Sequence, residues 1–65
     1  MGDEKVIMQQ INMLSAEHRS IDLIIEELEA AGTDVLRIRK LKKRKLAIRD
    51  QISILESMLH PNLIA

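Results

Sequence analysis

The chain has 65 residues, equal numbers of acidic and basic side chains (10 each), no cysteine and no aromatic residue. A chain of this length forms one domain, residues 1–65, and buries little of its surface. The composition excludes disulfides and thiolate-bound zinc, and the lack of aromatic side chains argues against an enzyme pocket or a base-stacking surface.

The chain shows no sign of a membrane span or of a signal peptide. No apolar run approaches the roughly 18 residues that a span needs. The first residues, Met1 to Glu4, are acidic and lack the apolar core of a signal peptide. We therefore expect a cytoplasmic protein, and the absence of cysteine agrees with a reducing compartment.

The first predicted element is a helix over residues 4–31, with Asp3 as its N-cap. Apolar residues recur in it at alternating spacings of four and three, which is the heptad pattern of a helix–helix seam. One seam member, His18, is polar. The seam residues of this arm are Ile7, Ile11, Leu14, His18, Ile21, Ile25 and Leu28.

A turn is predicted at residues 32–34. Gly32 suits the C′ position of the first helix because glycine adopts a left-handed backbone without steric cost. Either Thr33 or Asp34 is a suitable N-cap for a second helix. A break of this length between two periodic segments predicts two antiparallel helices.

The second predicted helix covers residues 35–59, and His60-Pro61 ends it because the residue before a proline leaves the helical region. Residues 60–65 are predicted to be a short tail. The seam continues with one polar member, Lys45. The seam residues of this arm are Ile38, Leu41, Lys45, Ile48, Ile52, Leu55 and Leu59.

The fold class is therefore all-α: a coiled-coil-like, two-helix antiparallel hairpin. Folding at the central glycine brings the two seams together from end to end, and it places Asp22 opposite Lys42 on one flank. The predicted layers are Leu28 with Ile38, Ile25 with Leu41, Ile21 with Lys45, His18 with Ile48, Leu14 with Ile52, Ile11 with Leu55, and Ile7 with Leu59.

Charged and apolar residues outside the seam define a candidate partner surface on the second arm. Such residues are often scattered surface aliphatics. We favour a second contact face, because a two-helix hairpin buries its seam only partly; the face serves self-association into a dimeric four-helix bundle or binds a partner helix. The candidate residues are Leu36, Arg39, Lys40, Lys43, Leu46, Asp50 and Ile54.

The basic stretch 37–49 has several interpretations. The charged residues of the segment 17–34 are acidic except for Arg19. The simplest interpretation is therefore a solvated basic face whose positive charge the acidic first arm balances. Nucleic acid, an acidic protein or an anionic membrane surface are alternatives. A net charge of zero and the absence of aromatic residues weaken the nucleic-acid interpretation, which remains the leading alternative function.

Two polar seam residues are candidates for a functional site. His18 and Asp22 share a helix face and are suited to begin a metal site, but two ligands do not hold zinc, and His60 lies at the far end of the hairpin. Lys45 is either a device that fixes register and oligomeric state or a lysine whose stem packs while its ammonium reaches water, which we favour. We predict no metal, no cofactor and no catalytic residue.

The pattern of the second half of the chain resembles a known family. The segment from Leu41 to Ile52, Leu-Lys-Lys-Arg-Lys-Leu-Ala-Ile-Arg-Asp-Gln-Ile, is the most specific part of the resemblance. The other matching residues are His18, Ile21, Asp22, Ile25, Leu28, Glu29 and Asp34. This pattern resembles the small bacterial YdcH-like family, a domain of unknown function. The resemblance implies a cytoplasmic helical hairpin of Gram-negative bacteria and assigns no activity. Together these features predict a non-enzymatic protein-interaction module.

Overall fold

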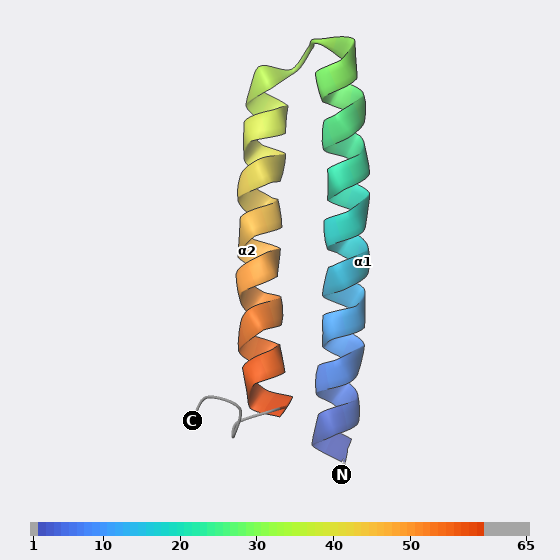
Figure 1. The fold of residues 1–65 in the computed structure, drawn as a ribbon, viewed down its shortest axis with the longest axis vertical. Helices are drawn as coiled ribbons and strands as arrows, with labels where there is room; N and C mark the ends of the chain where they lie inside the picture. The colour runs from blue at the N-terminus through green and yellow to red at the C-terminus, as the bar shows by residue number, and fades with distance from the viewer. Residues whose placement is uncertain (1, 60–65) are drawn as a thin grey trace.

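The computed structural model describes residues 2–59, which form two helices and no strand: α1 (Gly2–Ala31) and α2 (Val35–Leu59). The helices run antiparallel and lie side by side, with the turn at one end and the start of α1 beside the end of α2 at the other (Figure 1). The predicted all-α hairpin is confirmed. The predicted ending at His60-Pro61 and the tail 60–65 lie outside the described residues.

Helix α1 begins at Gly2, two residues before the predicted start. Asp3 is therefore not the N-cap, and it lies with Glu4 inside the first turn of the helix. Both carboxylates remain favourable there, because the unpaired N–H groups of a helix start carry partial positive charge. Aspartate is favourable both as an N-cap and in the first turn of a helix, so the residue type alone does not distinguish these two positions for Asp3.

The turn between the helices is a Schellman motif followed by a second left-handed residue. The N–H of Gly32 (φ 67°) donates to the carbonyls of Leu28 (3.1 Å) and Glu29 (3.2 Å), and that of Thr33 donates to Leu28 (3.4 Å). Asp34 (φ 59°) directly precedes α2, and its carbonyl accepts the N–H of Ile38 (3.0 Å). Glycine and aspartate are suited to these two backbone positions.

The two seams face each other as predicted. Every seam residue of both helices is buried or half-buried. The most buried side chains are those of Ile21, Ile25 and Ile48 near the middle of the hairpin. Further seam residues pack against these three: Leu14, Ile38, Leu41 and Ile52.

Most of the other large apolar side chains are exposed. Two helices cover each other along one stripe only, so the remaining faces of both meet solvent. The exposed residues are Val6, Met8, Met13, Leu23, Ile24, Val35, Leu36, Leu46, Ile54 and Met58. The described chain thus buries three large apolar side chains and exposes ten.

Candidate functional site

The candidate partner surface lies on α2, outside the seam that packs against α1. Its core is a row of residues spaced by four and three, which we call the outer row. All of its members are exposed, as are the flanking Arg39 and Leu46. The outer row consists of Leu36, Lys40, Lys43, Ala47, Asp50 and Ile54.

Only some of the basic residues of α2 face the acidic helix α1. Three form ion pairs across the hairpin: Lys42 Nζ with Glu29 Oε2 (3.2 Å), Arg44 Nη2 with Glu17 Oε2 (3.0 Å), and Lys45 Nζ with Asp22 Oδ1 (2.7 Å).

The charged members of the outer row take no part in these contacts. Within residues 3–59, Lys40, Lys43 and Asp50 form no ion pair. They are exposed, so their charges are available to a second molecule. The opposed acidic and basic blocks of the sequence therefore neutralise each other only in part.

The two polar seam residues meet at Asp22. Lys45 donates a hydrogen bond to one oxygen of this carboxylate, and Nδ1 of His18 lies 3.8 Å from the other. The predicted pairing of Asp22 with Lys42 is therefore wrong. Lys45 occupies a seam position, where its ammonium would otherwise lie among aliphatic side chains, so it pairs with the carboxylate of Asp22. Lys42 pairs instead with Glu29, which lies nearer the turn.

This contact changes the acidity of Asp22. The hydrogen bond from Lys45 holds the pKa of the carboxyl group below its ordinary value of 3.8. Burial opposes this shift, while the positive charges of Lys45 and His18 add to it. The side chains of Lys45 and His18 are each 30% exposed, so the charged cluster remains in contact with water.

The same cluster is poorly suited to bind a metal ion. One oxygen of Asp22 already accepts the ammonium of Lys45, which occupies the position that a cation would take. In the part of the chain that the structure describes, no three side chains of metal-ligating types lie together. His60, the other histidine of the chain, lies outside that part.

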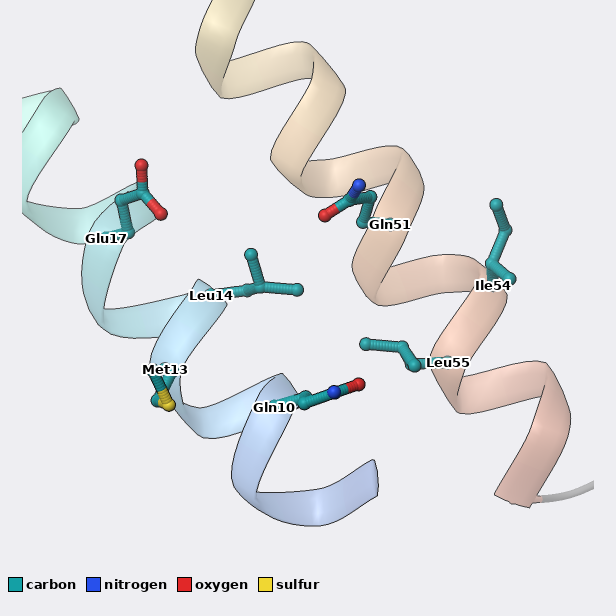
Figure 2. A pocket seen from close by; sticks show the side chains of 7 residues that line it. All are labelled: Gln10, Met13, Leu14, Glu17, Gln51, Ile54 and Leu55. Carbon is teal, nitrogen blue, oxygen red and sulfur yellow. The ribbon is translucent and has the colours of Figure 1, made fainter. Parts of the chain in front are cut away.

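An apolar groove runs between the helices in the half of the hairpin away from the turn. Its volume is about 500 Å³. Leu14 and Leu55 point toward one another across the space between the helices, and Gln10 and Gln51 approach it from either side (Figure 2). The lining residues are Gln10, Met13, Leu14, Glu17, Gln51, Ile54 and Leu55.

This groove was not predicted from the sequence. Of the predicted partner surface, only Ile54 lines it. A signal was present, because Met13 and Ile54 each precede a seam residue by one position. In an antiparallel pair, the residues at that offset on both helices lie on the same side of the seam. Two large apolar residues there therefore indicate an apolar groove on that side.

A second groove, called the polar groove after its lining, is lined mainly by polar and charged residues, among them His18 and Asp22 of the cluster described above. Its lining residues are Ser15, His18, Arg19, Asp22, Arg49, Ile52, Ser53 and Glu56. The described hairpin thus presents the apolar groove, the polar groove and the outer row.

Neither α1 nor α2 combines the length and the apolar character that crossing a membrane requires.

Comparison with known proteins gives one match. The model of a family described as a protein of unknown function, DUF465, matches residues 12–56 of the chain. That family includes the YdcH-like proteins, so the match confirms the resemblance found in the sequence. No curated protein and no solved structure matches the chain. The match spans most of both helices and the turn between them.

Proposed function

Since the chain belongs to the DUF465 family of small helical domains of unknown function, we propose that it is a non-enzymatic protein-interaction module. In this proposal the hairpin binds another α-helix, supplied by a second copy of the chain or by a different protein. The bound helix contacts exposed apolar side chains of the outer row or of the apolar groove.

The imbalance between buried and exposed apolar side chains carries this proposal. Three large apolar residues are buried and ten are exposed in the described chain. Leu14 and Leu55 in the apolar groove, with Met13 and Ile54 beside them, offer a strip into which side chains of a third helix fit. Burial of such surface is the main favourable term in helix association in water.

The polar side chains that lie together support a structural role over a catalytic one. Lys45 pairs with Asp22 across the hairpin, and His18, on the same helix as Asp22, lies 3.8 Å from the other oxygen of that carboxylate. Both grooves lie open to solvent along the surface of two helices. Catalysis by acid–base or nucleophilic groups requires a site that orients a substrate and excludes water, which a two-helix surface offers poorly.

Site-specific photocrosslinking tests the proposal in cells. A photoreactive amino acid is placed at Met13, which reports on the apolar groove, at Leu36, which reports on the outer row, or at Arg19 in the polar groove as the control. We expect a discrete adduct, with a second copy or with another protein, from Met13 or Leu36 and none from Arg19. Equal crosslinking at all three positions, or none at any, would contradict the proposal.

A second candidate function is weak association with nucleic acid through residues 37–49. The observation that favours it is a group of exposed cations on α2, with no ion pair among residues 3–59: Arg37, Arg39, Lys40 and Lys43. Phosphate contacts of this kind weaken steeply with salt. Fluorescence anisotropy with duplex and single-stranded DNA at about 50 and 200 mM salt tests it. Absence of binding at the lower salt concentration would eliminate this candidate.

A further inference from the structure

The outer row has the same spacing whether it is counted from the N-terminal or the C-terminal end of α2. Its positions 36, 40, 43, 47, 50 and 54 are separated by 4, 3, 4, 3 and 4 residues. Two copies of α2 that run antiparallel and cross near Lys45 therefore place every row residue opposite a row residue of the other copy. The opposed pairs are Leu36 with Ile54, Lys40 with Asp50, and Lys43 with Ala47, each occurring twice.

We propose that the outer row binds the outer row of a second copy, in antiparallel orientation about a two-fold axis near Lys45. The dimer then contains four helices, with the two copies of α2 in contact and the two copies of α1 on the outside. This inference rests on the proposed function and identifies the bound helix as α2 of a second copy. An interface of this type is self-complementary, because residue i meets residue j and residue j meets residue i.

The two ends of the row supply its main apolar contacts. Leu36 is 71% exposed and Ile54 is 62% exposed in the single hairpin. They lie 18 positions apart, or about 27 Å along the helix. In the antiparallel arrangement Leu36 of each copy covers Ile54 of the other, so both ends of the interface are apolar. A single hairpin leaves both of its side chains, Leu36 and Ile54, in water.

The charges of the row select the antiparallel orientation. In α2, Asp50 is the only acid among residues 35–55. In the antiparallel dimer it lies opposite Lys40, and neither residue has an ion-pair partner within residues 3–59 of one chain. In a parallel dimer Lys40, Lys43 and Asp50 would each face an identical charge, which is unfavourable at all three layers.

The two central layers place a small residue against a long one. Lys43 of one copy lies over Ala47 of the other, so the methyl group leaves space for the lysine stem while the ammonium reaches water. Leu46 is 57% exposed and flanks these layers, which adds apolar surface beside the row. A small side chain at this position also allows the two helices to approach closely.

Cysteine crosslinking tests the orientation, since the chain contains no cysteine of its own. We expect an equimolar mixture of Leu36→Cys and Ile54→Cys chains to form a mixed disulfide dimer in a redox buffer, identified by mass spectrometry. Each variant alone should remain unlinked, because two copies of residue 36 lie about 27 Å apart and a disulfide needs Cα atoms within about 7 Å. Efficient self-linkage of Leu36→Cys alone would overturn the antiparallel arrangement.

Charge exchange tests the pairing of Lys40 with Asp50. We expect the wild-type protein to sediment at twice the 7.5 kDa of one chain at high concentration. Lys40→Glu and Asp50→Lys should each weaken dimerisation by about tenfold, and the double variant should restore it. Glu26→Lys, which makes the same charge change as Asp50→Lys on the exposed side of α1, is the control and should have little effect.

Two results of this experiment would overturn the dimer. One is a monomer at all concentrations, and the other is a double variant that fails to recover. A monomer that still crosslinks to a different protein through Leu36 or Met13 would refute the dimer alone and leave the proposed function standing. Failure of all crosslinking together with a monomer would refute both.

Discussion

Lys45 occupies a seam position that an aliphatic residue would fill in a uniform coiled coil. Its side chain is 30% exposed, and its ammonium donates a 2.7 Å hydrogen bond to Asp22 of the opposite helix. His18 lies on the other side of the same carboxylate, 3.8 Å away. A polar layer of this kind stabilises less than an aliphatic one, and it favours the alignment in which the three groups meet.

The depressed pKa of Asp22 predicts a loss of stability in acid. A carboxylate whose folded-state pKa lies below its ordinary value of 3.8 stabilises the fold fully above that value, and this contribution is lost as the pH falls through the lower pKa. We expect Asp22→Asn to be less stable than the wild type near neutral pH, and the difference to shrink as the pH falls below about 5.

Thermal unfolding followed by circular dichroism from about pH 7 down to about pH 2 measures this difference. Glu26→Gln is a suitable control, since Glu26 is exposed and forms no ion pair within residues 3–59. It should not reproduce the pH-dependent difference. A stability gap between Asp22→Asn and the wild type that stays constant across the acid range would argue against a stabilising contact between Lys45 and the Asp22 carboxylate.

Ile48 is the most buried residue of the described chain, at 1% exposed. We expect Ile48→Ala to lower the free energy of unfolding by about 2–4 kcal/mol, because it leaves a cavity where the seam is densest. Leu23→Ala removes a similar aliphatic side chain that is 58% exposed, and it should cost less than about 0.5 kcal/mol. Urea unfolding compares the two; equal losses would show that the seam does not hold the hairpin together.

At the scale of the elements, the heptad spacing was sufficient to predict both helices and the side on which they meet. Every seam residue is buried or half-buried, because the spacing of four and three keeps these residues on one stripe of each helix. The ion pairs were harder to predict. Lys42 and Lys45 lie one turn apart, and the layer pairing alone does not decide which of the two long side chains reaches Asp22.

The turn depends on the left-handed backbone of Gly32. A Cβ atom built there meets no heavy atom within 4 Å, so substitution is opposed by the backbone conformation alone (φ 67°). We expect Gly32→Ala to destabilise the hairpin by about 1 kcal/mol, because an L-residue is strained in this region. D-alanine at the same position, introduced by chemical synthesis, should recover the stability in thermal unfolding. Equal destabilisation by both alanines would indicate a steric cause instead.

For the molecule as a whole, the arrangement of surfaces follows from having only two helices. Each helix covers one stripe of the other, so the sequence predicted exposed apolar residues outside the seam, and ten large ones are exposed. The apolar groove was not predicted, since its depth depends on how far Gln10 and Gln51 extend between the helices beside Leu14 and Leu55. Such details depend on rotamers and helix separation, which a residue pattern does not specify.

A chain that buries so few side chains fully should gain stability by association. When folding and dimerisation are coupled, the melting temperature depends on protein concentration. We expect the midpoint of thermal unfolding to rise by several degrees over about a hundredfold increase in concentration. Leu36→Asp should abolish this dependence, because it places a charge in the end layers of the proposed dimer, and Leu23→Asp on the exposed side of α1 should preserve it. A high midpoint that is independent of concentration would mean that the three buried isoleucines and the half-buried seam suffice for a stable monomer.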